Sequence, residues 1–157
     1  MFDAETVAFL EGGCSLIVSL TLADGAPYAA RGWGLEVRDT SDQPEIRLIL
    51  GARDTERTPE EFRSGQLAVT GADVLTLHSL QVKGRTSGLE PAGADDLERV
   101  QRYCDAFFAD VFTVDGTAPE LMQRLVPDRF SVCTIEVDAV FDQTPGPAAG
   151  AKVESAP

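Results

Sequence analysis

The chain has 157 residues, which suits one globular domain, and its 43% hydrophobic and 25% charged residues are inconsistent with global disorder. Its 26 acidic residues outnumber 13 lysines and arginines, so the formal net charge is -13. Because nucleic acids and anionic lipid surfaces attract basic proteins, we expect neither class of partner. No apolar run is long enough for a membrane span, and Asp3 and Glu5 stand where a signal peptide would be basic. We therefore expect a cytoplasmic protein.

The rare residue types limit the chemistry that the side chains can perform. His78 is the single histidine, so a multi-histidine metal site is impossible and we predict no metal site. A Ser-His-Asp or Cys-His catalytic site would have to use this residue. Cys14, Cys104 and Cys133 lie far apart in apolar patterns, which predicts reduced, buried cysteines. Redox or transfer chemistry in this chain would therefore depend on a bound cofactor.

Alternating apolar and polar residues in the first third of the chain predict half-buried β-strands. Asp24-Gly25 lies between two such segments and is typical of a tight hairpin, because both positions tolerate positive φ. The expected elements of this part are a short helix over residues 5–10, strands over 15–23, 28–37 and 46–52, and a polar turn over 40–44.

The middle of the chain combines a helix signal with two further strands. Thr-Pro-Glu-Glu at residues 58–61 has the pattern of a capping box, and Gly65 suits a left-handed helix end. Strands are expected over residues 66–70 and 74–85. In the second of them the apolar residues change phase, which predicts a bulge near His78-Ser79.

The last third contains the strongest helical pattern, with apolar residues at helical spacing over residues 97–111. Thr-Ala-Pro-Glu at residues 117–120 repeats the capping-box pattern, and a final strand is expected over 130–141. Six strands with helices at intervals predict a mainly β, α+β fold, a small antiparallel barrel with covering helices. We expect one domain over residues 1–147 and a flexible tail over 148–157, which is rich in small residues.

Several motifs along the chain resemble a known family. They are Phe-Leu-Glu-Gly-Gly before the strand at residues 15–21, Asp-Gly-Ala-Pro before Arg-Gly-Trp-Gly at 31–34, the strand, loop and short helix over 48–65, Ser-Leu-Gln-Val-Lys-Gly-Arg at 79–85, and the ending at 141–147. Together they resemble the FMN-binding split-barrel family typified by pyridoxamine 5'-phosphate oxidase. The resemblance extends to residue 150. It implies a six-stranded antiparallel split β-barrel that pairs as a homodimer, with an FMN in each of two clefts at the dimer interface.

The resemblance also implies which residues bind the flavin phosphate. In the family an arginine of the second strand does so, and Arg31 matches that position. A hydroxyl and a basic residue of the loop after the third strand assist it, and Thr55 and Arg57 match them, with Arg53 as a neighbouring candidate. Guanidinium groups suit a dianionic phosphate because they donate two hydrogen bonds at once. The alternative to phosphate binding is that Arg31 is an exposed strand residue and that the other candidates lie in a solvated loop.

Further candidates lie beside the expected flavin ring and ribityl chain. Ser79, Gln81 and Lys83 occupy the strand that runs beside the flavin in relatives, and the strand register decides which of them faces the cofactor. The alternative is ordinary polar pairing across strands. Trp33 is the single tryptophan and could stack on a ligand, or pack in the core or the dimer interface.

Three functions follow from these observations. The leading hypothesis is an FMN-dependent oxidoreductase acting on a small-molecule substrate or electron donor, because a flavin supplies the reactive atoms that these side chains lack. The second is a non-catalytic binding module that carries or senses haem, a deazaflavin or another ligand. The third is a dimeric interaction protein with a decayed cofactor cleft, because Glu56, Glu60 and Glu61 crowd the place of a phosphate. No catalytic residue is assigned.

Overall fold

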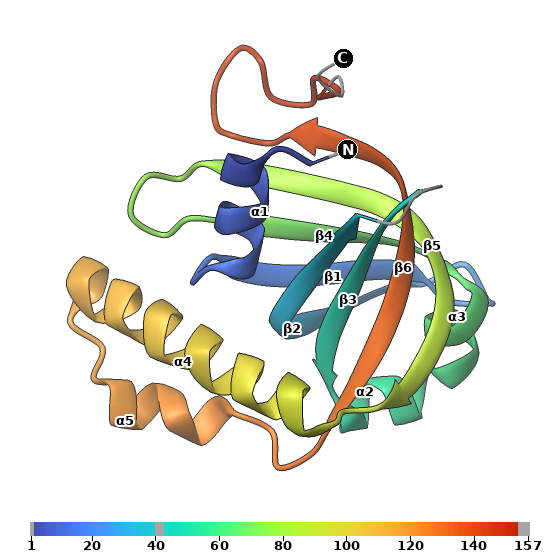
Figure 1. The fold of residues 1–157 in the computed structure, drawn as a ribbon, viewed down its shortest axis with the longest axis horizontal. Coiled ribbons are helices and arrows are strands. Elements are labelled where there is room, and N and C mark those ends of the chain that lie inside the picture. Colours follow the sequence, from blue (N-terminus) through green and yellow to red (C-terminus); the bar gives the residue numbers. More distant parts are fainter. Residues whose placement is uncertain (1, 40–42, 154–157) are drawn as a thin grey trace.

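The computed structural model describes residues 2–39 and 43–153, which form a closed barrel of six antiparallel strands. The order around the barrel is β1-β2-β3-β6-β5-β4. The strands are β1 (Ser15–Thr21), β2 (Pro27–Asp39), β3 (Pro44–Gly51), β4 (Gln66–Ala72), β5 (Ser79–Pro91) and β6 (Phe130–Asp142). This architecture confirms the predicted α+β class and the six-stranded antiparallel barrel (Figure 1).

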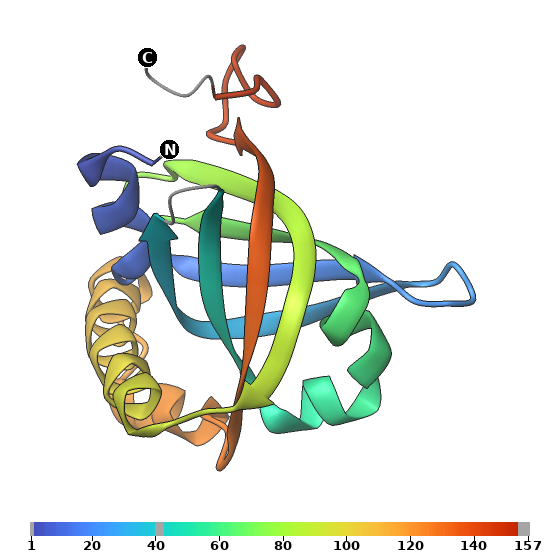
Figure 2. The ribbon, with the colours of Figure 1, turned by 45° about the vertical axis from the view of Figure 1, so that its right-hand side comes forward.

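Helices cover the outside of the barrel. Helices α1 and α4 lie on the side of β2, and α2 and α3 lie together near one end of the barrel, where the chain passes from β3 to β4 (Figure 2). The helices are α1 (Ala4–Glu11), α2 (Ala52–Arg57), α3 (Pro59–Ser64), α4 (Ala94–Asp115), α5 (Pro119–Met122) and the short 3-10 helix η1 (Gln123–Leu125). None of the described helices is long and apolar enough to cross a membrane.

The interior of the barrel is filled by rows of apolar side chains that the strand register places opposite one another. Ala30, Val18, Val69 and Val82 form one such row across β2, β1, β4 and β5, and all four are buried. Burial of a valine side chain stabilises the fold by about 1.5–3 kcal/mol. A register shift by one residue would turn each of these side chains outward. The inner row therefore also determines which residues face outward.

The strand predicted over residues 74–85 begins only at Ser79, because the preceding residues form a turn. The backbone N–H of Asp73 donates to the carbonyl of His78 at 2.8 Å, and Leu77 has a φ of 64°. The predicted bulge near His78-Ser79 was therefore wrong: the change of phase marks the end of a turn. The irregularities of β5 lie farther along the strand, in its pairing with β6.

Both predicted capping boxes were wrong. The hydroxyl of Thr58 donates to the carbonyl of Asp54 at 3.4 Å, so it completes the preceding helix α2 and makes no cap for α3. The backbone N–H of Thr117 likewise donates backward, to the side chain of Asp115, and α5 has no side-chain cap. The left-handed helix end predicted at Gly65 was also wrong, because Gly65 ends α3 in an extended conformation with a φ of -87°. Glycine is required there for a different reason, since a Cβ would lie 2.3 Å from the Glu61 carbonyl oxygen.

Two predicted segments fall partly outside the described residues. The polar turn over residues 40–44 is one of them, since residues 40–42 are not described. The expected tail over 148–157 is described as far as residue 153, and there the backbone N–H of Gly150 donates to the carbonyl of Asp142 at 2.7 Å. The domain boundary after residue 147 stays a prediction.

Gly84 lies at an irregularity of β5 where a side chain cannot be accommodated, because its Cβ would lie 2.1 Å from the carbonyl oxygen of Glu136. We expect Gly84→Ala to lower the free energy of unfolding by about 2–3 kcal/mol, the cost of an overpacked interior, as measured by urea denaturation. Gly88→Ala is the matched control, since a Cβ at Gly88 would have Thr134 Oγ1 as its nearest neighbour, at 4.0 Å. Equal losses in the two variants would contradict this account.

Candidate functional site

Residues from distant parts of the chain form a row on the outer face of the barrel. Arg31 lies opposite Ile17, Ile17 opposite Thr70, and Thr70 opposite Gln81. Opposite residues share a face, and Ile17 is 46% exposed while its neighbour Val18 is buried, so this row points outward. Adjacent strands are about 4.8 Å apart, so the row from Arg31 to Gln81 extends over about 14 Å. Two predicted site residues therefore share one surface.

The next outward row consists of small side chains and one cation. Ala29, Ser19, Ala68 and Lys83 lie opposite one another across the same four strands. An open groove of about 560 Å³ is lined by residues of this row, and Phe141 forms part of its wall. The ammonium group of Lys83 lies 4.8 Å from the centre of the Phe141 ring. Small side chains thus leave room for a ligand beside Lys83 and the carboxylate of Asp138, which also lines the groove.

The three polar residues predicted beside a cofactor differ in what their side chains do. The hydroxyl of Ser79 is buried and donates to the carbonyl of Leu77 at 2.9 Å, so it stabilises the turn before β5. The amide nitrogen of Gln81 donates to Thr70 Oγ1 at 3.0 Å on the outer face. Lys83 is exposed on the same face. Gln81 and Lys83 are therefore the two that line the outer surface.

Arg31 is a half-buried cation that pairs with no carboxylate among residues 2–39 and 43–153. Its Cζ lies 4.5 Å from the centre of the Phe107 ring on α4 and 5.2 Å from that of the Trp33 ring. Its Nε and Nη2 are buried and make no hydrogen bond. Two aromatic faces attract the guanidinium, but they do not replace the hydrogen bonds that it loses to burial. This environment fits an anionic group that would complete the hydrogen bonding of Arg31.

Trp33 lies with its ring against the guanidinium of Arg31 and is almost fully buried. It is 4% exposed, and its ring meets that of Phe130 edge to face at 6.5 Å. Packing of this kind is typical of a core aromatic residue. Trp33 is therefore placed beside Arg31 as a packing partner, with almost none of its ring exposed to a ligand.

Tyr103 is a second buried polar residue at this place, and sequence reasoning missed it. It is 2% exposed, and its hydroxyl forms no hydrogen bond of good geometry within the described part of the chain, although it lies close enough to Arg31 and to the Leu16 backbone for both to lower its pKa. Burial raises the pKa of Tyr103 to about 12, although the positive charge of Arg31 acts to lower it. Tyr103 lies four residues before Phe107, a spacing that places both side chains on one face of a helix, and their rings stack at 5.8 Å. This spacing was the sequence signal that Tyr103 faces β2.

Thr55 lies on helix α2, where the sequence predicted a loop. Its hydroxyl is buried, donates to the carbonyl of Ala52 at 3.1 Å and lies 3.0 Å from the hydroxyl of Ser131 on β6. These bonds attach α2 to the beginning of β6. The hydroxyl is thus already engaged within the protein, and in this structure it is covered.

Arg53 and Arg57 are exposed on the same helix. The Cζ of Arg57 lies 5.8 Å from the centre of the Tyr28 ring, and the Tyr28 hydroxyl donates to Asp54 at 2.8 Å. Burial, together with that hydrogen bond, raises the pKa of Tyr28 to about 12. Within residues 2–39 and 43–153, no hydrogen bond, ion pair or ring contact joins α2 to Arg31. Among the described residues, the predicted phosphate-binding residues of α2 thus make no direct contact with Arg31, and their joint role stays a prediction.

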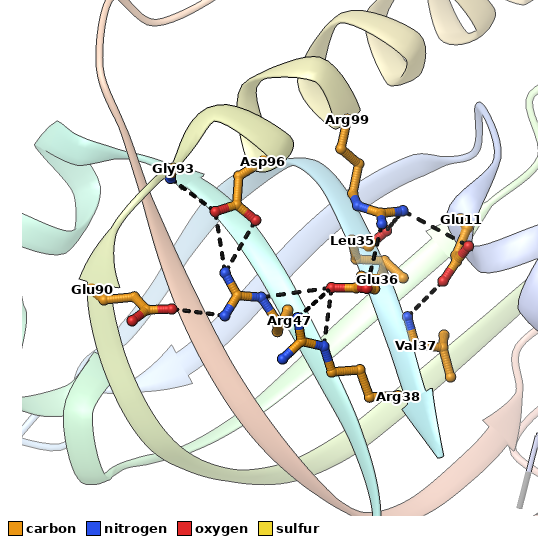
Figure 3. Close-up of polar contacts among 10 residues, drawn as sticks. All are labelled: Glu11, Leu35, Glu36, Val37, Arg38, Arg47, Glu90, Gly93, Asp96 and Arg99. Carbon is orange, nitrogen blue, oxygen red and sulfur yellow. Dashed lines mark hydrogen bonds and ion pairs between the residues drawn. The ribbon is translucent and has the colours of Figure 1, made fainter. Parts of the chain in front are cut away.

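A cluster of ion pairs holds the first turns of α4 against the barrel (Figure 3). Both carboxylate oxygens of Asp96 accept from Arg47 Nη2 at 3.1 Å, and Glu90 accepts from Arg47 Nη1 at 2.7 Å. Burial lowers the pKa of Arg47, but these hydrogen bonds outweigh it and raise that pKa above its usual value. Glu36 lies 3.7 Å from Arg47 and 3.6 Å from Arg99, so it links β2 to both arginines.

The cluster extends to α1 and surrounds a cavity of about 470 Å³. Glu11 lies 3.8 Å from Arg99 Nη1 and accepts from the backbone N–H of Val37 at 2.8 Å. Arg38 in the cavity wall pairs with Glu36 at 3.0 Å. Since each arginine of this cavity has a carboxylate partner, the cluster is suited to hold elements together and has no cation left for an anionic ligand.

The cysteines are free and buried, as predicted. Burial raises the pKa of Cys14 and of Cys133 to about 12 and that of Cys104 to about 11, so their thiols are protonated at neutral pH and are poor nucleophiles. In the part of the chain that the structure describes, no three histidine, cysteine or acidic residues gather to hold a metal ion.

We expect Arg47→Met to lower the free energy of unfolding by about 2–4 kcal/mol in urea denaturation, because it leaves the largely buried carboxylate of Asp96 without its cation, whereas Glu36 keeps Arg38 and Arg99. Arg63→Met is the matched control. Its side chain is 59% exposed and its pair with Glu60 measures 3.5 Å, so we expect less than about 0.5 kcal/mol. A loss as small at Arg47 as at Arg63 would show that the cluster does not hold α4.

No family model matches this chain, and no curated protein does so either. Solved structures share its fold at low sequence identity. HupZ of Group A Streptococcus is 17% identical with a TM-score of 0.55, over 96% of this chain and 100% of that one. An F420 reductase is 18% identical with a TM-score of 0.53, over 85% and 93% of the two chains. A candidate pyridoxamine 5'-phosphate oxidase from Lactobacillus delbrueckii is 15% identical with a TM-score of 0.51, over 89% and 93%. The chain therefore has the split-barrel fold of the pyridoxamine 5'-phosphate oxidase-like proteins.

Proposed function

We propose that this protein binds FMN on the outer face of its barrel and acts as a flavin-dependent oxidoreductase. The observation that carries the proposal is Arg31, whose Nε and Nη2 are buried without a hydrogen-bond partner. A buried cation without an anion destabilises a folded protein, whereas a phosphate would both neutralise it and accept its hydrogen bonds. Arg31 is thus the residue that would bind the flavin phosphate.

The rest of the outer face suits the remaining parts of FMN. The outward row from Arg31 to Gln81 extends over about 14 Å across four strands, so it offers contacts along an elongated ligand. Gln81 offers a polar group for the ribityl chain or the ring, and Lys83 lies in the wall of the groove as a positive charge. The small side chains of Ser19 and Ala68 leave space for a flat ring.

The outer face also supports a homodimer. The groove is open to solvent, and Ile17 is 46% exposed beside it. A redox-active ring needs protection from water, which one barrel wall alone does not provide. A second copy of the chain related by twofold symmetry would supply the missing wall from the same surface patch.

A bound FMN would supply hydride and single-electron chemistry at its ring. The chain itself would contribute binding at Arg31, orientation by the outward row and exclusion of water by its partner copy. Lys83 would place positive charge near the ring. The F420 reductase with the same fold makes a deazaflavin the second candidate.

The first test is the visible spectrum of the purified protein with and without added FMN. We expect flavin bands at about 375 and 450 nm, with FMN released on denaturation. Arg31→Ala is expected to weaken FMN binding by about 1.5–3 kcal/mol, the value of a charged hydrogen bond. Arg63→Ala, on the exposed surface of α3, should bind FMN like the parent. Equal affinity in the parent and Arg31→Ala would refute the phosphate assignment, and a Soret band or deazaflavin spectrum would refute FMN.

The homodimer is tested by sedimentation velocity. We expect the parent to sediment as a dimer and Ile17→Asp to sediment as a monomer with weakened FMN binding, because a charge would then lie in the interface. Leu121→Asp is the matched control: Leu121 is also exposed, at 54%, but lies on α5 away from the groove, so this variant should remain a dimer. A monomeric parent that retains one FMN per chain would disprove the shared site.

A further inference from the structure

We infer that Tyr103 is a binding residue for the same anion as Arg31 and that its hydroxyl donates a hydrogen bond to one of the anion's oxygens. The inference rests on the proposed function in taking that anion to be the phosphate of FMN. Two neighbouring groups support it: within the described residues, the buried Nε and Nη2 of Arg31 and the buried hydroxyl of Tyr103 form no hydrogen bond of good geometry, and the two side chains are close enough for Arg31 to lower the pKa of Tyr103.

The phenol of Tyr103 is more than a space-filling ring. A phenylalanine would fill the same volume beside Phe107, and a buried hydroxyl without a partner destabilises the fold by about 1–3 kcal/mol. The other tyrosine of the chain shows the usual arrangement, because the Tyr28 hydroxyl donates to Asp54 at 2.8 Å. The hydroxyl of Tyr103 is therefore an exception that a bound acceptor would resolve.

The protonation states of the two groups define the ligand. The guanidinium of Arg31 has only donors. With its pKa raised to about 12 by burial, Tyr103 remains a neutral phenol at physiological pH and can donate its proton in a hydrogen bond. The nearby thiol of Cys14, with a pKa of about 12, is protonated as well and already donates to the carbonyl of Leu10 at 3.8 Å, so it adds no negative charge. A place with several donors and no charged acceptor selects an anion with several oxygens, as a phosphoryl group has.

The position of Tyr103 is fixed by its neighbours on α4 and β2. Its ring stacks on that of Phe107 with an interplanar angle of 4°, and Phe107 in turn covers the guanidinium of Arg31. The ion pairs of Arg47 hold the beginning of the same helix. Since the unpartnered atoms lie beneath α4, the anion reaches them only when side chains of this helix move apart. Tyr103 therefore joins ligand binding to the packing of α4.

The test compares FMN with riboflavin, which lacks the phosphate, by fluorescence titration of the parent and Tyr103→Phe. We expect the variant to bind FMN about tenfold more weakly and riboflavin within twofold of the parent, the effect of one hydrogen bond to a charged group. In an Arg31→Ala background the same substitution should have a smaller effect, because the two donors act on one anion. Unchanged FMN affinity, or equal losses for FMN and riboflavin, would overturn the inference.

Two further measurements separate a failure of this inference from other failures. Tyr103→Phe should leave the melting temperature of the ligand-free protein unchanged or higher, whereas Tyr28→Phe should lower it, because Asp54 then loses its donor. A lower melting temperature in Tyr103→Phe would assign the hydroxyl a structural role and overturn the inference. If the parent binds neither flavin, the proposed function fails, and inorganic phosphate becomes the probe. Stabilisation of the parent by millimolar phosphate that is lost in Tyr103→Phe would then support the inference, and no stabilisation would overturn it.

Discussion

The attachment of α4 by Arg47 is the interaction on which the rest of the candidate site depends. Arg47 on β3 binds Asp96 in the first turn of the helix and Glu90 just before it. With its beginning held there, the 22-residue helix crosses the barrel with its apolar side toward β2. That side covers Arg31 and removes it from water. The paired charges around Arg47 therefore hold the helix that buries the unpaired charge of Arg31.

The candidate site and the hydrophobic core lie on opposite faces of the same strands. Val18 and Val69 point inward, and the neighbouring Ile17 and Thr70 point outward in the row that contains Arg31. The energy of core packing thus fixes the register, and the register fixes the spacing of the outward side chains. The outward rows are therefore positioned before any ligand binds, which reduces the ordering that binding requires of the strands, whereas the place beneath α4 opens only when side chains of that helix move. The register also explains why residues far apart in the sequence can share one surface.

The parts of the fold that depend on a repeating pattern were predictable from sequence, and the parts that depend on single contacts were not. Alternation identified most of the strands, and helical spacing identified α4. Helix α2 was missed because it has six residues and no side-chain cap. The capping pattern at Thr58 was misread because a carbonyl of the preceding helix competes for its hydroxyl. At the site, Arg31 followed from a family resemblance, whereas the importance of Tyr103 depends on a missing hydrogen bond that no sequence pattern records.

The order of the strands has a consequence for synthesis of the protein. Strand β6 lies between β3 and β5 and is the last strand to leave the ribosome, so the barrel cannot close until residue 142 has been translated. Before then β3 and β5 each present an open edge whose backbone N–H and C=O groups can pair with another chain. Closure also joins segments distant in sequence, which makes folding slow. The open edges of β3 and β5 in a nascent chain of this protein therefore stay exposed to aggregation until β6 pairs with both of them.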